Sequence, residues 1–284
     1  MSRWDKHLLR HDSKGDECPQ CGYTGAVSVS PEKGLWFCHS CHLGGRTDDE
    51  DHPTVSDATT KRTYSREEKR AYVAQILSEC GPVAGSAAEI YLNERGLGKY
   101  VSSPFLWAHE ALWNAESKRE WDALVAVVID PMTSNRTAIH RTWLTPGGCK
   151  APLKHPRKTL GSAKGGLIAL DNPPVTIDTD RPGVPVHELH VVIGEGIESS
   201  ASAGILFELP AFAAVSAGNL GFHLRLPPEI TSVVIAADMD APGRLNMGRA
   251  VHRWQAEGRH VEITYPRREG ADFNDLLRER VQDG

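Results

Sequence analysis

From about residue 188 to the end of the chain, short apolar segments alternate with segments of helical periodicity, and few folds accommodate this alternation. Alternating strands and helices of these lengths pack as a mostly parallel sheet with helices on both faces. The sequence therefore predicts an α/β fold for residues 187–284. The predicted strands are LHVVIGEG (189–196), AFAAVSAGN (211–219), TSVVIAADMD (231–240) and HVEITYP (260–266), and the predicted helices cover 197–209, 242–257 and 272–281.

Acidic residues stand where these strands are predicted to end. Glu195 lies in the sequence GEG, Asp238 and Asp240 lie in DMDAPGR, and Asp272 lies in GADFND. Ligands bind at the carboxyl ends of strands in an open parallel sheet, and carboxylates that meet there repel one another unless cations hold them. Since hard oxygen ligands suit Mg²⁺, the pattern predicts a magnesium site. The alternative is that each carboxylate separately caps the helix that follows it.

Two CxxC pairs near the N-terminus form a second motif. Cys18 and Cys21 are separated by 16 residues from Cys38 and Cys41. Four thiolates in this spacing are typical of a tetrahedral zinc site. We predict a zinc-ribbon domain over residues 1–46, in which the metal is structural because so short a segment has little core of its own. The alternative is four buried or redox-active cysteines.

Between these two regions, residues 47–62 are polar and read as a linker, and residues 63–186 read as a helical and mixed α/β subdomain. Ser65 with Glu68 has the pattern of a capping box at the start of a helix. A second helix is predicted over 86–95. Strands are predicted over 123–130, 138–144 and 167–171.

The middle subdomain contains a basic stretch, residues 131–170, with seven Lys or Arg residues and no Asp or Glu. The whole chain has 32 basic and 37 acidic residues, for a net charge of −5, which excludes a uniformly basic nucleic-acid coat. Any polyanion site must therefore be local. The alternative is an ordinary solvated basic face. The candidate phosphate contacts are Arg141, Arg157, Lys158 and Lys164, together with Arg244 beyond the stretch.

The acidic motifs in this order resemble those of the Toprim domain, which is shared by bacterial-type DNA primases, type IA and type II topoisomerases, recombination-mediator proteins and some nucleases. The zinc motif ahead of them narrows the resemblance to primases. YLNERGL (91–97) and RKTLGSAKGGLIAL (157–170) are similar to the segments that precede the Toprim domain in phage- and plasmid-type primases.

The resemblance implies a DNA-directed RNA polymerase that makes short RNA primers on single-stranded DNA from ribonucleoside triphosphates. Two-metal phosphoryl transfer is the implied mechanism. Asp238 and Asp240, with Asp272 nearby, would hold Mg²⁺ or Mn²⁺. Glu195 would either ligate a metal or accept the proton of the attacking 3′-hydroxyl. The basic stretch would border the active-site cleft and contact template and nucleotide.

Three positions depart from the family pattern. Cys21 stands where bacterial primases often have a His zinc ligand. Glu198 lies three residues after Glu195, whereas the second acidic residue of the family usually lies four residues on. Asn274 stands where a second Asp often follows, so we assign metal ligation to Asp272 and not to Asp275.

The remaining features limit the alternatives. The N-terminal residues lack the apolar core of a signal peptide and no apolar stretch is long enough to span a bilayer, so we expect a cytoplasmic protein in a reducing compartment. Cys80 and Cys149 are interpreted as inert thiols. No GxxxxGK[ST] motif occurs, so unwinding would need a separate replicative helicase. A metal-dependent Toprim nuclease or a non-catalytic DNA-binding adaptor remains the alternative function.

Overall fold

A computed structural model describes most of the chain from residue 65 onward, together with three short strands near the N-terminus. Of strands β1 to β3, of residues 241–245 and of Gln282, only the backbone is described. The predicted linker, 47–62, lies outside the described residues. The described ranges are 27–30, 35–38, 44–46, 65–171, 189–237, 241–266, 268 and 270–282.

The C-terminal part of the chain contains a five-stranded sheet with the strand order β12-β11-β9-β10-β8. Its first four strands are parallel, and β8 is antiparallel to β10. The predicted mostly parallel α/β sheet is therefore confirmed. The strands are β8 (Ile168–Ala169), β9 (Leu189–Gly194), β10 (Ala211–Ala213), β11 (Ile230–Ala236) and β12 (His260–Thr264).

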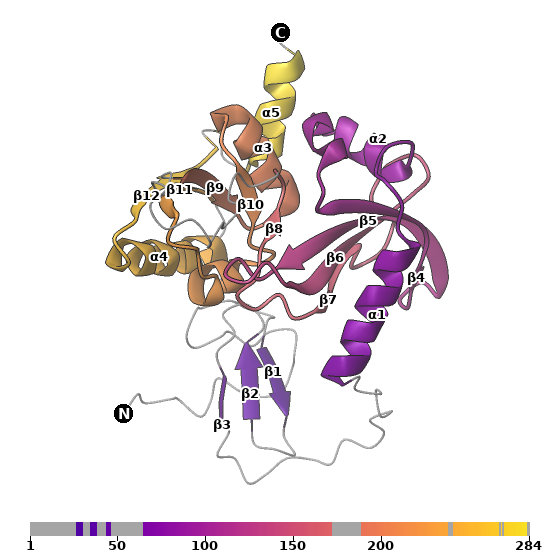
Figure 1. Cartoon of the computed structure of the whole chain (residues 1–284), viewed down its shortest axis with the longest axis horizontal. Coiled ribbons are helices and arrows are strands. Elements are labelled where there is room, and N and C mark those ends of the chain that lie inside the picture. Colours follow the sequence, from indigo (N-terminus) through magenta and orange to yellow (C-terminus); the bar gives the residue numbers. More distant parts are fainter. Residues whose placement is uncertain are drawn as a thin grey trace, which may run out of the picture.

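Helices cover both faces of this sheet (Figure 1). Alternate residues of a strand point to opposite faces, and β9 shows the consequence. Val192 packs in the same core as α3 (Ile197–Phe207) and α5 (Phe273–Gln282). Val191 packs instead with α4 (Ala241–Ala256) and with a short π-helix, η3 (Asn219–His223). The sheet is buried on both sides, as its continuous apolar strands predict.

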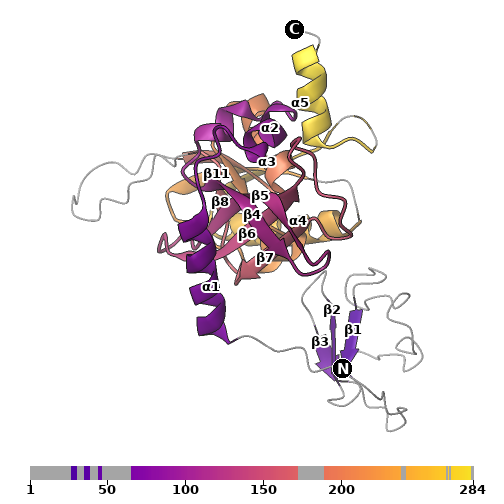
Figure 2. The ribbon, with the colours of Figure 1, turned by 90° about the vertical axis from the view of Figure 1, so that its right-hand side faces the viewer.

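The middle part of the chain contains an antiparallel sheet with the order β4-β5-β6-β7. The helix α1 (Arg66–Glu79) packs on one face, where Ile76 joins a core with residues of β5 and β6. Figure 2 shows α1 lying across this sheet. The other face packs against α2 (Ala87–Asn93) and a 3₁₀ helix, η2 (Gly98–Ser102). The strands are β4 (Leu106–Asn114), β5 (Arg119–Ile129), β6 (Arg136–Leu144) and β7 (Arg157–Gly161).

The two sheets share one core, because residues of β5 and β6, of α2 and of the parallel sheet with its helices α3 and α5 belong to a single buried apolar cluster. The chain segment between them contributes to both. Leu167 forms a bridge with Ile129 of β5, and the next residues form β8 beside β10. The middle subdomain and the α/β sheet are thereby joined through backbone hydrogen bonds as well as side-chain packing.

Most predicted elements are present, with shifted ends, and the Ser65–Glu68 capping box of α1 is confirmed. The strand predicted over 211–219 was too long, since β10 ends at Ala213. The side chain of Asn219 donates a hydrogen bond of 2.8 Å to the carbonyl of Ala214, which helps to fold the segment back as η3. The strands β4 and β7 were not predicted.

Near the N-terminus, the described backbone forms a three-stranded antiparallel sheet. Its strands are β1 (Val27–Ser30), β2 (Leu35–Cys38) and β3 (Gly44–Arg46). The predicted zinc ligand Cys38 ends β2, while Cys18, Cys21 and Cys41 lie outside the described residues. Zinc binding therefore stays a prediction. Among the helices described, none has the length and apolarity needed to cross a membrane.

Candidate functional site

The two strands that carry the main acidic motifs are neighbours in the parallel sheet. Gly194, the last residue of β9, is in register with Ala236, the last residue of β11. Glu195 follows directly, and Asp238 comes two residues after Ala236 in the sequence. The ends of β9 and β11 therefore lie side by side at one edge of the sheet, and the GEG and DMD motifs follow them in the sequence. Asp238 and Asp240 themselves lie outside the described residues.

The GEG loop is shaped by close packing between strand and helix. A Cβ atom on Gly194 would lie 2.7 Å from the Ser200 Oγ, so only glycine fits at this strand end. Ser200 in turn donates its hydroxyl hydrogen bond to the carbonyl of Gly196, at 2.6 Å. These contacts fix the backbone on both sides of Glu195. The side chain of Glu195 is partly exposed, and it is not free, because it interacts with another group of the protein.

Asp272 lies at the start of α5, and its described contacts are those of a helix cap. Its Oδ1 accepts a hydrogen bond of 2.8 Å from the backbone N–H of Asp275. The Asp275 carboxylate accepts one of 3.1 Å from the N–H of Asp272. This reciprocal arrangement is a capping box, the alternative that the sequence left open for this residue. Metal ligation by Asp272 stays a prediction.

The carboxylates fit a hard divalent cation by their chemistry and by the register of β9 with β11. Among the residues that the structure describes, no group of three or more His, Cys, Asp or Glu side chains is arranged to hold a metal ion. Two of the four predicted magnesium ligands are outside that part of the chain. The magnesium site therefore stays a prediction that rests on the strand ends.

Glu198, in the first turn of α3, is bound by groups of the middle subdomain. Its carboxylate accepts hydrogen bonds from the Tyr91 hydroxyl at 2.5 Å and from the Lys150 Nζ at 2.7 Å, and the Arg157 guanidinium lies at 3.4 Å. Burial by itself would raise the pKa of this carboxyl, but Lys150 and Arg157 outweigh it and lower the pKa to about 2. Glu198 is therefore ionised at neutral pH.

The basic stretch forms β6, β7 and the turns around them, and its cations have different surroundings. Arg141 is only 9% exposed, and its guanidinium lies 4.9 Å from the centroid of the Trp143 ring. Burial lowers the pKa of Arg141. The side chains of Arg157 and Lys158 are 47% and 41% exposed, and the Lys158 Nζ lies 3.5 Å from Glu116. Arg157 and Lys158 are therefore more accessible to a phosphate than Arg141 is.

Lys164 is exposed on a turn that the parallel sheet holds in place. Asn219 of η3 accepts a hydrogen bond of 2.8 Å from the N–H of Gly165 and donates one of 2.8 Å to the carbonyl of Gly166. Asn219 is buried, so these hydrogen bonds are shielded from water. The side chain of Arg244 lies outside the described residues. All five predicted phosphate contacts stay predictions.

Three residues of this region were not predicted from the sequence: Tyr91, Lys150 and Asn219. Each acts through partners that lie far away in the chain. Tyr91 and Glu198, for example, are 107 residues apart. No periodicity or motif spacing indicates such a pair. The segment 91–97 did carry a family resemblance, which was the one available signal for Tyr91.

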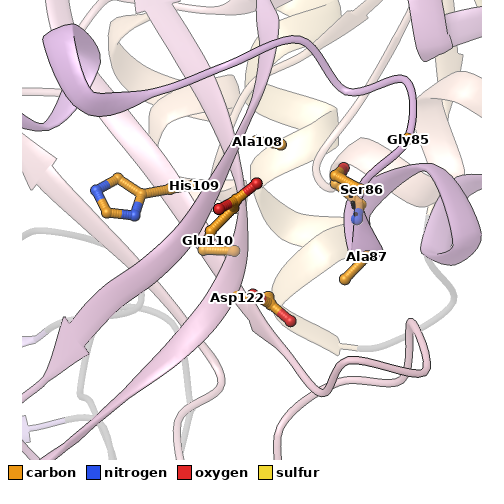
Figure 3. Close-up of a pocket in the computed structure, with 9 residues that line it drawn as sticks. Gly85, Ser86, Ala87, Ala108, His109, Glu110 and Asp122 are labelled. Atoms are coloured by element: carbon orange, nitrogen blue, oxygen red, sulfur yellow. Dashed lines mark hydrogen bonds between the residues drawn. The ribbon is translucent and has the colours of Figure 1, made fainter.

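A hollow of about 240 Å³ lies between the start of α2 and strands β4 and β5. Figure 3 shows Glu110 and Asp122 on the strand side of this hollow, opposite Ser86 and Ala87, while His109 points away from them. Burial, reinforced by Glu110, raises the pKa of Asp122. None of the predicted site residues that the structure describes lines the hollow.

Comparison with known families gives two matches. The Toprim domain family matches residues 190–283, and a domain of unknown function, DUF7146, matches residues 67–170. The range 67–170 contains α1, α2 and the antiparallel sheet. The range 190–283 contains four of the five strands of the α/β sheet and all three of its long helices. Comparison with curated proteins gives no match.

Several solved structures are similar to this chain at low identity. The primase fragment of the bacteriophage T7 primase-helicase protein is 14% identical with a TM-score of 0.41, over 94% of this chain and 96% of that chain. The Aquifex aeolicus primase (zinc-binding and RNA polymerase domains) is 14% identical with a TM-score of 0.49, over 94% and 75%. The RNA polymerase domain of the Mycobacterium tuberculosis primase DnaG is 13% identical with a TM-score of 0.40, over 76% and 82%.

The family match covers the strands and helices whose acidic motifs resemble those of Toprim domains. The register of β9 with β11 places the ends of these two strands side by side, and the first two motifs follow them in the sequence. The predicted resemblance to the Toprim domain is confirmed over residues 190–283, which the Toprim family model matches.

Proposed function

We propose that this protein is a DNA primase that joins ribonucleotides into short primers on single-stranded DNA. The observation that carries the proposal is the adjacency of the ends of β9 and β11, which the GEG and DMD motifs follow in the sequence, within the region that the Toprim family model matches. Exposed cations of the preceding subdomain, including Arg157 and Lys158, support it. An acidic strand-end site beside accessible cations suits a reaction between a nucleic-acid end and a nucleoside triphosphate.

The proposed roles of the residues follow from their charge and position. Asp238 and Asp240, with Asp272 as a further candidate, would hold Mg²⁺ or Mn²⁺. Glu195 would either share this task or accept the proton of the attacking 3′-hydroxyl. A bound divalent cation supplies charge neutralisation on the phosphoryl group and on the leaving oxygen. The GEG loop would keep Glu195 in place, because the contacts of Gly194 and Ser200 fix its backbone.

The basic stretch would position the polyanionic substrates. We assign phosphate contacts to Arg157, Lys158 and Lys164, with Arg141 and Arg244 as further candidates. Lys164 is well placed for this role, since it is exposed on a turn whose backbone Asn219 anchors to the Toprim domain. A fixed turn presents its charge without a large loss of conformational entropy on binding.

Further components belong to the proposal. The four cysteines Cys18, Cys21, Cys38 and Cys41 would bind one structural Zn²⁺, and this module would contact the template. A separate replicative helicase would supply the unwound strand.

Product sizing tests the proposed function. Purified protein is incubated with single-stranded DNA, Mg²⁺ and labelled ribonucleotides, and the products are separated by length. A primase gives short labelled oligoribonucleotides that depend on template and nucleotides. Degradation of the DNA without nucleotides would favour the nuclease alternative, and DNA binding without either reaction would favour the adaptor.

A further inference from the structure

Glu198 connects the Toprim domain to three separate segments of the preceding subdomain. Its carboxylate accepts a hydrogen bond from the Tyr91 hydroxyl of α2. It also forms ion pairs with Lys150, in the loop between β6 and β7, and with Arg157 of β7. The two nearest groups lie 2.5 and 2.7 Å away, on Oε1, and the guanidinium lies 3.4 Å from Oε2. Both oxygens of the carboxylate are therefore engaged by donors.

The carboxylate and the hydroxyl of this cluster have low exposure, whereas its two cations reach the surface. The Glu198 side chain is 13% exposed and Tyr91 is 1% exposed, while Lys150 is 33% and Arg157 is 47% exposed. The Tyr91 ring also stacks against the Arg95 guanidinium, which lies 3.8 Å from the ring centroid. Loss of a cation would therefore leave the Glu198 carboxylate, which has low exposure, without full compensation of its charge.

The remainder of α3 is fixed to the same subdomain by further contacts. The Tyr100 hydroxyl donates a hydrogen bond of 3.2 Å to the carbonyl of Ala201. Asn274 of α5 donates from the same amide nitrogen to the carbonyl of Arg95 at 2.8 Å and to the Ser202 hydroxyl at 3.0 Å. The helix α3 is thus held to the preceding subdomain in its first turn by Glu198 and near its middle by Ala201, while Asn274 bridges Ser202 to Arg95.

The surroundings of Glu198 do not suit a divalent cation. Lys150 and Arg157 would repel Mg²⁺ electrostatically, and both would have to leave before either carboxylate oxygen became a ligand.

We propose that Glu198 is a positioning residue: it fixes the Glu195 loop against the preceding subdomain through Lys150, Arg157 and Tyr91, and it is not a ligand of the catalytic metal. This inference rests on the proposed function in one respect, which is the catalytic role of the Glu195 loop that Glu198 positions. It also assigns a role to Lys150, whose charge is used within the protein and not on a substrate.

A double-mutant cycle tests the contact itself. Glu198→Gln keeps the size and the Tyr91 hydrogen bond but removes the charge, and Lys150→Met removes the cation. We expect each variant to melt at a lower temperature than wild type without Mg²⁺, and the double variant to lose less than the sum of the two. Glu262→Gln, on exposed β12, is the matched control and should melt like wild type. Additive losses would overturn the proposal.

A Mg²⁺ titration separates positioning from ligation. If Glu198 positions the loop, Glu198→Gln retains the thermal stabilisation that Mg²⁺ gives to wild type, and the Mg²⁺ dependence of primer synthesis is unchanged. The kcat falls roughly ten- to hundred-fold, because the reacting groups are misplaced. Glu195→Gln is the comparison and should respond less to Mg²⁺. A Glu198→Gln protein that is more stable without Mg²⁺ and no longer stabilised by it would identify Glu198 as a ligand and overturn the proposal.

The cycle does not depend on the proposed function. If wild type makes no primers, the primase proposal fails, and the melting temperatures of the four proteins still decide whether Glu198 joins the two parts of the chain.

Discussion

Asp272 and Asp275 cap each other's backbone at the start of α5, with hydrogen bonds of 2.8 and 3.1 Å. Asp272 was predicted as a metal ligand, so this finding gives it two possible roles. The Oδ1 atom serves the helix, since it accepts from the Asp275 N–H. Capping alone requires an acceptor at this position, whereas metal ligation also requires the negative charge.

Substitution of Asp272 distinguishes the two roles. Asp272→Ala removes the cap and should lower the free energy of unfolding by about 1 kcal/mol. Asp272→Asn keeps an acceptor of similar capping strength, so its stability without Mg²⁺ should match wild type. If Asp272 also binds metal, the Asn variant loses primer synthesis despite normal stability. Normal synthesis by Asp272→Asn, measured beside its thermal melt, would leave Asp272 as a cap alone.

The Glu198 ion pairs predict a pH dependence of stability. The pKa of Glu198 is about 2 in the folded protein against an ordinary value of 4.5, so its charge stabilises the fold above pH 4.5. This contribution is lost as the pH falls from 4.5 toward 2, because the carboxyl becomes protonated in the unfolded chain first. By linkage it amounts to on the order of 3 kcal/mol. Wild type and Glu198→Gln should therefore differ most above pH 4.5.

Denaturant titrations at a series of pH values check this prediction. The difference in free energy of unfolding between wild type and Glu198→Gln should shrink steadily below pH 4.5. A difference that stays constant down to the lowest pH at which both proteins fold would show that the charge of Glu198 is not what stabilises the contact.

The zinc prediction concerns the N-terminal cysteines. Metal analysis of freshly purified, reduced protein should give about one zinc per chain. Cys38→Ser should lose the metal and unfold the N-terminal module, while the parallel sheet keeps its thermal transition because the predicted linker 47–62 separates the two in the sequence. Protein that is fully active but contains no zinc would contradict the zinc ribbon.

The basic stretch predicts a salt-dependent interaction with nucleic acid. Lys158→Ala and Lys164→Ala should each weaken binding of single-stranded DNA, and the dependence of log affinity on log salt should become shallower by about one per lost phosphate contact. Lys69→Ala, exposed on α1 outside the stretch, is the matched control. Binding curves of the double variant that overlay those of wild type at several salt concentrations would favour the solvated basic face.

The sequence predicted those parts of the fold whose signals are local. The GEG loop combines an apolar strand with a glycine that the packing of Ser200 requires, and the capping box of α1 is a pattern of two residues three apart. The strand β4 was missed because a bulge between His109 and Leu112 interrupts its period-two pattern. The strand β7 was missed because its charged residues Arg157 and Lys158 masked the alternation of half-buried and exposed positions.

In the candidate site, too, the sequence predicted the features that follow from local signals and did not predict the contacts between distant segments. The adjacency of the ends of β9 and β11, which Glu195 and Asp238 follow in the sequence, results from the topology of a parallel sheet. The partners of Glu198 do not, because Tyr91, Lys150 and Arg157 reach it only through the packing of one sheet against the other. Arg141 shows the converse, since a charge in a basic stretch can be buried against the sheet, beside Trp143, when strand alternation points it inward.

The acidic strand ends are the centre of the proposed function, and primer synthesis by their amide variants tests them most directly. Glu195→Gln, Asp238→Asn and Asp240→Asn are compared with wild type and with Asp130→Asn, a control in a turn of the middle subdomain. Each of the three variants should fold and bind single-stranded DNA but make no labelled primers, while the control makes them at the rate of wild type. Primer extension by an Asp238→Asn, Asp240→Asn double variant would contradict the account.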